Sequence, residues 1–328
     1  MKIIVTHNSP DMDAITSVWL IKRFLPGWEN AIVQFVLAGE RFKNSEFRIQ
    51  NSELKDTIEK IGDDEAIHVD TGLGPLDHHQ TASDKVCAAS LTWEFVRIQN
   101  SEFRIQNDKW RDKAQAIDRI VKVVVDTDHF KEVFWEDTMA DYHEFSVVAI
   151  LDGLKLLIPN QDEYYVDFVS SCLDAILHEF ENRIWAEKEI AENGQKFETR
   201  FGKGIGFETI NDSVIKLAQK MGYVVVVRKD PRKGYVRVKA MPSRKRLVSQ
   251  RLASSSNLKD QKLNAKRYTL DAGVDLTLAY EKLKKMDPTA TWFLHIGKKM
   301  LLNGSAKNPK MRPTKLGLGD IIKVLEKI

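Results

Sequence analysis

The order of apolar and polar positions predicts alternating strands and helices in the first part of the chain. The apolar run KIIVTH, at 2–7, predicts a buried strand, and Ser9 and Pro10 suit the cap and first position of a helix that follows in DMDAITSVWLIKRFL. Further strands are predicted for AIVQFVLA and EAIHVD, with a helix, LKDTIEKIG, between them. This alternation is typical of a doubly wound, mostly parallel sheet, which binds ligands at the carboxyl ends of its strands.

The middle and the end of the chain have different patterns. Apolar residues recur at helical intervals from 141 to 193 and stop at Gly194, which predicts a helical bridge. YVVVVRK and YVRVKAM flank the turn DPRKG and predict a β-hairpin, while DLTLAYEKLKKM, TWFLHIG and GLGDIIKVLEKI add a helix, a strand and a closing helix. We therefore expect an α/β sheet domain at 1–140, a helical bridge at 141–200 with a linker near 194–206, and a smaller α+β domain at 201–328.

Composition is that of an ordinary globular protein. The 328 residues favour two domains, and 43% are hydrophobic and 30% charged. Two distant cysteines, Cys87 and Cys172, form neither a CxxC pair nor a disulfide framework, so we expect a reducing compartment and the cytoplasm. The start of the chain is no signal peptide, and no apolar run approaches the roughly 18 residues of a membrane span, so we expect no membrane role.

Basic residues gather late in a chain whose net charge is only +3. The segment VRKDPRKGYVRVKAMPSRKRLVSQR holds ten Lys or Arg against one Asp, and SQRLASSSNLKDQKLNAKR is predicted to be a mobile basic loop. This asymmetry favours a partner that carries phosphates, with an ordinary solvated surface as the alternative.

One seven-residue unit occurs twice, in NSEFRIQNSEL (44–54) and in RIQNSEFRIQN (97–107). Two separated copies are too few to stack as a solenoid. We interpret them as insertions into two surface sites, because a longer loop costs little free energy. A duplicated contact surface is the alternative.

Three segments gather the residue types that bind metal ions, each at the expected end of an apolar run. They are HNSPDMD, HVDTGLGPLDHHQ and KVVVDTDHF, and their candidate ligands are His7, Asp11, Asp13, Asp70, Asp77, His78, His79, Asp126, Asp128 and His129. Because neighbouring strand ends meet at one edge of a parallel sheet, these groups predict a metal site. His68, on the apolar run before Asp70, is expected to be packed or hydrogen-bonded rather than a ligand.

These motifs resemble a known superfamily. HNSPDMDA, VDTG and LDHHQ, in this order, resemble the first three motifs of the DHH phosphoesterases, which include exonucleases, oligoribonucleases, cyclic-dinucleotide phosphodiesterases and family II inorganic pyrophosphatases. The forms VDTG and DHHQ, with the late FLHIG and NGSAK, look most like the melanocyte-proliferating-gene family of metal-dependent hydrolases, whose characterised members are RNA exonucleases. The first motif keeps the Asp-x-Asp of the wider superfamily, and the C-terminal part lacks its GGGH signature.

The resemblance implies roles for the matching residues. His7, Asp13 and Asp70 would bind one metal, and Asp11, Asp70 and His78 the second, with Asp70 as the bridge. Asp128 is favoured over Asp126 as the ligand of the fourth motif, because Asp128 and His129 resemble an Asp-Asn pair of relatives. His79 would face the substrate phosphate, with Asp77 as the second catalytic residue.

Carboxylates and imidazoles without thiolates suit two Mn²⁺ ions, with Mg²⁺ as the alternative. The expected activity is hydrolysis of phosphodiester bonds in RNA or oligonucleotides from an end. The alternatives are a phosphatase or pyrophosphatase that acts on a small phosphorylated metabolite, and a nucleic-acid-binding protein without turnover. The oligomeric state stays open, with a homodimer as one alternative. Expected substrate-binding residues are Arg244, Arg246, His295, Lys299, Asn303, Gly304, Ser305 and Lys307.

Overall fold

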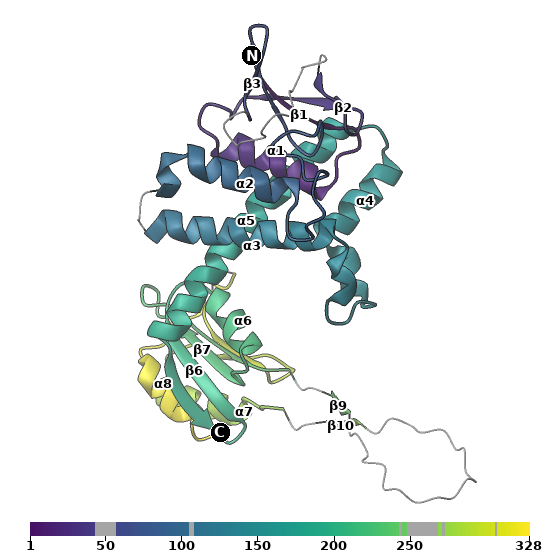
Figure 1. Cartoon of the computed structure of the whole chain (residues 1–328). Coiled ribbons are helices and arrows are strands. Elements are labelled where there is room, and N and C mark those ends of the chain that lie inside the picture. The colour runs from purple at the N-terminus through teal and green to yellow at the C-terminus, as the bar shows by residue number, and fades with distance from the viewer. Residues whose placement is uncertain (43–56, 105–107, 243–244, 248–267, 271–272, 306) are drawn as a thin grey trace, which may run out of the picture. The chain divides into compact units, whose positions relative to one another are not determined.

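The chain has a mixed α/β fold that divides into two units, Met1–Glu181 and Asn182–Ile328 (Figure 1). Each unit has its own sheet and helices. The computed structural model describes residues 1–42, 57–104, 108–242, 245–247, 268–270, 273–305 and 307–328. Within these ranges, no helix has the length and apolar character needed to cross a membrane.

The sheet of the first unit has the strand order β2-β1-β4-β3. Its central strand β1 (Lys2–His7) runs parallel to β2 (Ile32–Val36) on one side and to β4 (Asp64–His68) on the other. A short edge strand, β3 (Glu59–Ile61), runs antiparallel to β4. Because β1 and β4 are parallel neighbours, the residues that follow them meet at one edge of the sheet.

Burial of β1 explains its central place. Ile3 is 1% exposed, and Ile4 and Val5 are 0% exposed, so both faces of the strand are covered. Full burial of such a side chain is worth about 1.5–3 kcal/mol relative to exposure. A continuous apolar run of this kind is typical of parallel strands that lie between other layers.

The helix after β1 begins two residues later than the sequence predicts. α1 spans Met12–Phe24, and its cap is Asp11, whose carboxylate accepts hydrogen bonds from the backbone N–H groups two and three residues on, at 2.9 and 3.0 Å. Ser9, the expected cap, has a left-handed backbone with φ of 53°, and Pro10 precedes the helix. An aspartate caps a helix as well as a serine does, and its charge also suits the helix N-terminus.

Two further predictions about elements in this unit are wrong. KVVVD, taken for the end of a strand, is the last part of the helix α3 (Asp108–Asp128). The buried residues Ile117, Ile120, Val121 and Val124 recur at three- and four-residue intervals, so the helical period of the whole segment outweighs the local run of valines.

The second error concerns LKDTIEKIG at 54–62. The first three of these residues lie outside the described ranges, and Glu59–Ile61 form the strand β3 instead of a helix. Pairing with β4 satisfies the backbone of this segment, so tertiary context overrides its helical preference.

The helical region is as predicted. Two short 3-10 helices, η4 (Lys131–Phe134) and η5 (Asp141–Phe145), precede α4 (Val147–Leu157) and the long α5 (Asp162–Glu192). α5 ends just before Gly194, where the sequence places the end of the helical pattern.

The second copy of the repeated unit is partly built into the fold. It covers the end of α2 (Ala88–Gln99) and the 3-10 helix η3 (Ser101–Arg104). Asn100 is 6% exposed and donates from its side-chain amide to the Phe24 carbonyl at 2.8 Å. The first copy, 44–54, lies outside the described residues, as do 105–107 of the second.

The second unit is built on a six-stranded sheet with the order β11-β12-β8-β7-β6-β5. β6 and β7 are parallel and the other neighbours are antiparallel. Its strands are β5 (Gln195–Thr199), β6 (Gly202–Glu208), β7 (Val225–Lys229), β8 (Val236–Ala240), β11 (Phe293–Leu294) and β12 (Met300–Asn303). The helices are α6 (Ser213–Lys220), α7 (Thr277–Met286) and α8 (Leu318–Leu325), and β9 (Lys245–Leu247) pairs with β10 (Tyr268–Leu270) in a separate ribbon.

The hairpin of β7 and β8 and the helices α7 and α8 confirm the predicted elements of this unit. The linker expected at 194–206 is instead the antiparallel pair of β5 and β6. Ile205 and Phe207 of β6 are 0% exposed, so this segment is part of a core. The predicted mobile loop at 249–267 lies outside the described residues.

Candidate metal centre

Two strand ends bring the first pair of candidate ligands together. His7 is the last residue of β1, and Asp70 follows β4 by two residues; His7 Nε2 and Asp70 Oδ2 are 3.2 Å apart. His7 Nδ1 lies 2.9 Å from the Asn8 carbonyl oxygen, which can only accept, so Nδ1 is the protonated nitrogen in that bond. Nε2 is therefore the ring atom that this geometry directs toward the site.

Asp70 itself has an unusual backbone. Its φ is 54°, a left-handed conformation that costs free energy for a residue with a Cβ and that often occurs at functional sites. Asp70 N–H donates to the Leu76 carbonyl at 3.1 Å, which closes the loop that follows. Gly72 of this loop has φ of 77°, and a Cβ there would lie 3.0 Å from the Arg41 side chain. The glycine-rich sequence thus allows the turn that folds the chain back.

That turn places two imidazoles over Asp70. Asp70 Oδ1 is 3.9 Å from His78 Nε2 and 3.8 Å from His79 Nδ1. This oxygen is buried and has no hydrogen-bond partner. A buried carboxylate oxygen without a partner costs free energy, and it marks the point where a cation would fit best.

The end of α3 completes the cluster. Asp128 Oδ2 is 3.5 Å from His78 Nδ1 and 3.7 Å from His129 Nε2. Asp126, the alternative ligand, is turned to a different partner, since its carboxylate forms an ion pair with Lys122 at 2.7 Å. The geometry supports the choice of Asp128.

The structure groups Asp11 and Asp13 in the opposite way to the resemblance. Ligand atoms of His7, Asp11 and Asp70 lie within 4.8 Å of one another, whereas Asp13 Oδ2 is 4.0 Å from His78 Nδ1. Asp11 therefore belongs with His7, and Asp13 with His78. The reason is the start of α1: Asp11 is the cap and Asp13 lies in the first turn, so the two carboxylates point to different sides.

Asp13 also has a structural role. It is 1% exposed, and its carboxylate accepts hydrogen bonds from the backbone N–H groups of Ala88 at 2.7 Å and Ala89 at 2.6 Å. These N–H groups begin α2, so Asp13 satisfies two of the donors that a helix N-terminus leaves open.

Three carboxylates of the cluster have raised pKa values. Burial raises the pKa of Asp70, a change that the hydrogen bond from His7 opposes and the charge of Asp11 increases. Burial, together with the charge of Asp70, also raises the pKa of Asp13, and burial raises that of Asp128. Crowded acids of this kind are typical of sites that bind cations.

The pKa of His7 is also raised, which for a histidine favours the charged form. Burial alone would lower its pKa, but the hydrogen bonds to Asp70 and to the Asn8 carbonyl outweigh that effect and raise it to about 9. In the metal-free protein His7 is therefore protonated at neutral pH and offsets part of the negative charge. A bound divalent ion would take over that role, because metal ligation requires the neutral imidazole.

His79 is held by Asp77. Asp77 Oδ1 lies 2.7 Å from His79 Nδ1 and also accepts from the His79 backbone N–H at 3.0 Å. Asp77 is 4% exposed, while the His79 side chain is 59% exposed. Asp77 therefore orients the ring and leaves Nε2 directed away from that bond, which makes Asp77 a positioning residue.

Arg41 was not among the site residues predicted from the sequence. Its guanidinium donates to the Gly72 carbonyl at 2.6 Å and pairs with Glu59, so it fixes the loop that carries the ligands. His68 is 3% exposed, lies 3.1 Å from Glu59 and accepts from the Phe42 backbone N–H, so it is packed and hydrogen-bonded as predicted. No pattern in the sequence around Arg41 distinguishes it from any other arginine.

Neither cysteine contributes to the cluster. Cys87 is buried beside Asp13, and burial together with the charge of Asp13 raises the pKa of its thiol, which disfavours the thiolate that binds metals. Cys172, the other free cysteine, lies on α5. The donor set is thus carboxylates and imidazoles, as the sequence predicts.

The predicted substrate-binding residues belong to the second unit and have varied surroundings. Asn303 is 0% exposed, donates to the Thr291 and Arg312 carbonyls at 2.8 and 3.0 Å, and accepts from Thr314 N–H at 2.7 Å. Its amide is used within the fold, which removes it as a phosphate ligand. Lys299 donates from Nζ to the Val274 carbonyl at 2.7 Å, so its ammonium group is also engaged.

The remaining predicted residues are less constrained. His295 Nδ1 accepts from Gly297 N–H at 3.1 Å, and Gly304 has φ of 79° beside the Tyr235 ring, which leaves no room for a Cβ. Ser305 forms an isolated bridge with Asn308. Arg244 lies outside the described residues, and Arg246 is on β9.

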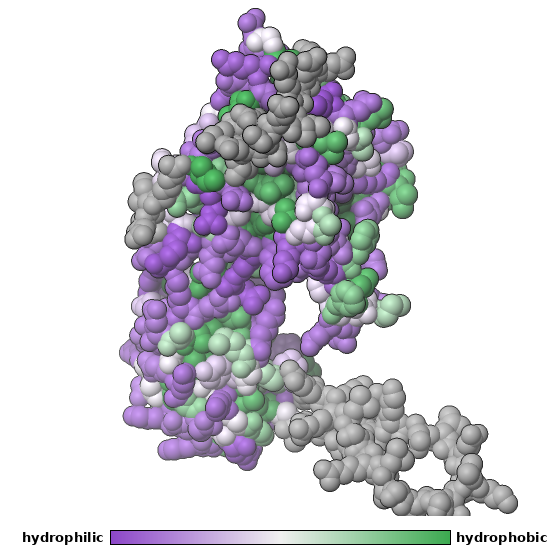
Figure 2. All heavy atoms as spheres, in the orientation of Figure 1, coloured by the Kyte–Doolittle hydropathy of each residue, from purple (hydrophilic) through white to green (hydrophobic). Residues whose placement is uncertain are grey.

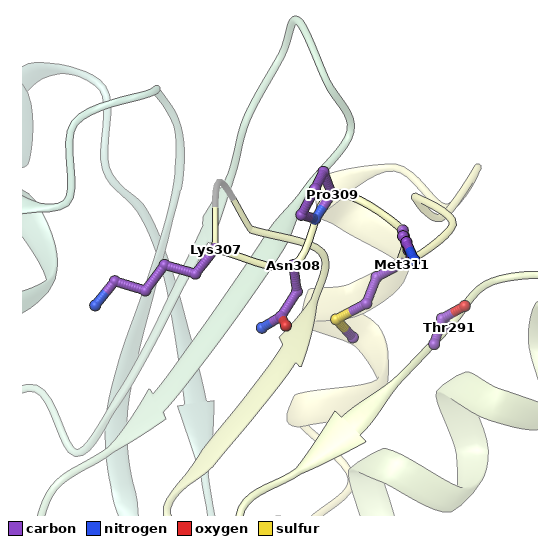
Figure 3. Close-up of a pocket in the computed structure, with 6 residues that line it drawn as sticks. Thr291, Lys307, Asn308, Pro309 and Met311 are labelled. Carbon is purple, nitrogen blue, oxygen red and sulfur yellow. The ribbon is translucent and has the colours of Figure 1, made fainter.

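Lys307 borders a surface pocket of about 440 Å³. Its Nζ extends away from the other lining side chains, while Asn308 and Met311 lie close to one another (Figure 3). The pocket is lined by Thr291, Lys307, Asn308, Pro309, Lys310 and Met311. The two lysines that line this pocket are Lys307, the last residue of NGSAK, and Lys310.

Comparisons with known proteins give little. No known protein family matches the chain, and no curated protein matches it. A crystal structure of an uncharacterized protein from Helicobacter pylori G27 matches 73% of this chain and 86% of its own length, at 13% sequence identity and a TM-score of 0.19. A TM-score this low identifies no common fold.

Proposed function

We propose that the chain is a phosphoesterase that uses two divalent metal ions. One observation carries the proposal: three imidazoles converge on Asp70, a buried carboxylate whose Oδ1 has no hydrogen-bond partner. The neighbouring carboxylates of Asp11 and Asp128 add negative charge around the same point.

The donors fit two hard or borderline ions. His7, Asp11 and Asp70 would hold one ion, and Asp70 with His78 the other, with Asp70 shared and Asp13 and Asp128 beside the other ring nitrogen of His78. Oxygen and imidazole ligands without thiolate suit Mn²⁺, with Mg²⁺ as the alternative. When bound, two such ions activate water and stabilise the charge that develops at a phosphorus centre.

The protein's own groups would act around these ions. His79, oriented by Asp77 and exposed at the rim, would hold a proton at Nε2 and donate a hydrogen bond to a phosphate oxygen. Hydrogen bonding to Asp77 and nearby acids raises the pKa of His79 against the effect of burial, which favours the protonated ring. Arg41 would keep the loop between Asp70 and Asp77 in place.

The fold is compatible with the DHH phosphoesterase resemblance. The parallel strands β2, β1 and β4, with candidate ligands at the carboxyl ends of β1 and β4, support a doubly wound sheet of that type. The three motifs that carry the resemblance meet at one place in the structure. We infer membership of this superfamily on those two grounds.

The proposed substrate is RNA or an oligonucleotide, cleaved from an end in the cytoplasm. The basic composition of the second unit supports a polyanionic substrate. Lys307 and Lys310, at a pocket of that unit, are the described cations best suited to a backbone phosphate.

The deciding experiment measures bound Mn²⁺ and phosphodiester hydrolysis together. Asp70→Asn should lose bound Mn²⁺ and lower the hydrolysis of a chromogenic phosphodiester at least 100-fold, because both ions share this carboxylate. Asp126→Asn is the matched control, since Asp126 lies two residues before Asp128 on α3 and pairs with Lys122 instead of the cluster. Crystals grown with Mn²⁺ should give two anomalous peaks at the cluster; full activity of Asp70→Asn would contradict the proposal.

A further inference from the structure

Helix α4 is apolar on most sides but hardly buried. Its sequence VVAILDGLKLL contains only two charged residues, Asp152 and Lys155, yet Leu151 is its one buried side chain. Leu156 and Leu157, at its end, are 85% and 79% exposed. A helix that is hydrophobic all round is normally covered by other protein, and the described residues of the first unit cover α4 only in part.

The segment before α4 extends the same feature. Phe130 is 75% exposed, Phe134 85%, Met139 93% and Phe145 86%. Figure 2 shows hydrophobic side chains gathered over the 3-10 segment that η4 and η5 form. Among the described residues, 11 of the 25 exposed large hydrophobic side chains fall within 130–158, so the clustering is local. We call Phe130, Phe134, Met139, Phe145, Leu156 and Leu157 the apolar surface.

The size of the apolar surface fits a protein partner. Each large side chain that is mostly exposed offers on the order of 150 Å², so six of them offer about 900 Å². A standard stable interface buries about 800 Å² on each partner.

The charges around it argue against nucleic acid and anionic membranes. Residues 130–158 hold six carboxylates against two lysines. Both lysines are engaged: Lys131 with Asp84, and Lys155 with the Ser9 carbonyl at 3.0 Å. A polyanion needs free cations beside its stacking surface, and this segment supplies none.

We propose that the apolar surface is the interface of a homodimer, in which two copies of the chain meet around a two-fold axis. A self-complementary surface of this kind lets α4 and the 3-10 segment of each copy cover those of the other. The acidic residues then lie at the rim of both copies, so salt should strengthen the dimer by screening their repulsion. This inference does not depend on the proposed phosphoesterase activity.

Sedimentation velocity of the full chain tests it. The parent should sediment as a species of twice the mass of one chain at micromolar concentration, and more completely in 0.5 M than in 0.05 M NaCl. Phe134→Asp and Leu156→Asp, on separate elements, should each raise the dimer dissociation constant at least tenfold, because a charge would be buried without a partner. Both positions are at least 85% exposed, so the variants should keep the parent's circular dichroism spectrum.

The control is Ile296→Asp, which changes an equally exposed hydrophobic residue (93%) of the second unit and should leave the dimer intact. A parent that stays monomeric at 100 µM in high salt would overturn the proposal. Two folded variants that dimerise as well as the parent would overturn it too. Salt-sensitive binding of single-stranded RNA to a monomeric parent, lost in Phe134→Asp, would assign the surface to nucleic acid instead.

Discussion

Asp70 concentrates the features that distinguish a site from a structural ion cluster. Its left-handed backbone and its unpartnered Oδ1 cost free energy in the metal-free protein, and it lies between three imidazoles. Asp126, outside the proposed ligand set, is arranged differently, because its carboxylate pairs with a lysine. Strain and unsatisfied charge at one residue are expected where a ligand supplies the missing interaction.

At the residue scale, Asp77→Asn separates positioning from metal binding. Asp77 contacts no candidate ligand atom of the two ion sites but orients His79 through Nδ1. We expect the variant to bind as much Mn²⁺ as the parent and to lose about 100-fold in kcat, the usual scale for a misplaced proton donor. Steady-state kinetics on a chromogenic phosphodiester at saturating Mn²⁺ measures this.

Asp84→Asn serves as the comparison, because this exposed carboxylate lies in the same loop region and pairs with Lys131. It should keep kcat within about twofold of the parent, since a surface ion pair contributes little. Equal losses in Asp77→Asn and Asp84→Asn would mean that the loop, and not His79, is affected.

The elements of the first unit supply ligands from three directions. β1 and β4 deliver His7 and Asp70 at their carboxyl ends, the first turn of α1 delivers Asp11 and Asp13, and the last turn of α3 delivers Asp128. Strand ends hold their side chains rigidly. The helix ends hold theirs within about one turn of backbone that is fixed by packing. Packing among α1, α2 and α3 therefore determines the spacing of the ligands.

The second copy of the repeat belongs to this packing. Phe103 makes edge contacts with Phe24, Trp93 and Trp110, with ring centroids 6.0, 5.0 and 5.0 Å apart. Phe103→Ala should lower the free energy of unfolding by about 2 kcal/mol, because it removes three aromatic pairs from a half-buried position. Urea unfolding of the full chain, followed by tryptophan fluorescence, measures the change.

Glu102→Ala, an exposed neighbour in η3, should change stability by less than about 0.5 kcal/mol. Activity per folded molecule should be unchanged in both variants. If Phe103→Ala is as stable as the parent, the copy is a surface insertion without a packing role, as the sequence alone suggested.

At the scale of the whole molecule, chemistry and charge are divided between two units with separate cores. The candidate ions belong to Met1–Glu181, while the basic segments belong to Asn182–Ile328. Substitutions in the second unit should therefore change the binding of a long substrate without changing hydrolysis of a small one. Two predictions test the properties of the second unit.

Asp287 makes the stability of the second unit sensitive to acid. It accepts hydrogen bonds from Thr289 and Thr314 at 2.8 Å and from Lys315 N–H at 2.9 Å, and these lower its pKa from 3.8 to about 2. Because the folded pKa is the lower one, the stabilisation is complete above about pH 4 and is lost as the pH falls toward 2. Asp287→Asn should lower the unfolding free energy at pH 7 by about 1–3 kcal/mol.

The check is urea unfolding of parent and Asp287→Asn at pH 7, 4 and 2.5. The difference between the two proteins should shrink across the lower interval, since protonation removes the charge that the variant lacks. A difference that stays constant down to pH 2.5 would contradict the role given to the carboxylate.

The salt dependence of RNA binding tests the polymer substrate. In an Asp70→Asn background, replacing Arg244, Arg246 and Lys307 by Ala should weaken binding of single-stranded RNA and reduce the salt slope by about 2, since each lost phosphate contact removes released counterions. In a chain with intact Asp70, the same triple change should leave hydrolysis of a small phosphodiester within about twofold.

A second triple variant controls for net charge. Lys216, Lys220 and Lys323 are exposed on α6 and α8, and their replacement by Ala should leave the slope nearly unchanged. Identical slopes for the parent and the Arg244, Arg246 and Lys307 variant would favour the small phosphorylated metabolite as substrate.

The elements whose apolar period is unambiguous could be predicted from the order of residues alone. β1, β4, the long helical region and the hairpin of β7 and β8 were predictable because burial of a regular apolar face requires one secondary structure. The same local logic identified the ligand types, since acidic and imidazole residues that follow buried strands must meet at a sheet edge. His68 was correctly assigned to the interior for the same reason.

Which of these side chains meet depends on how the elements pack against one another. The pairing of Asp11 with His7 and of Asp13 with His78 depends on where α1 begins, and the choice of Asp128 over Asp126 depends on how α3 is turned against His78. Asn303 changed from a substrate ligand to a buried structural amide because the segments at Thr291 and at 312–314 both contact it. Contacts between residues far apart in the chain are set by packing, and no local pattern of residues specifies them.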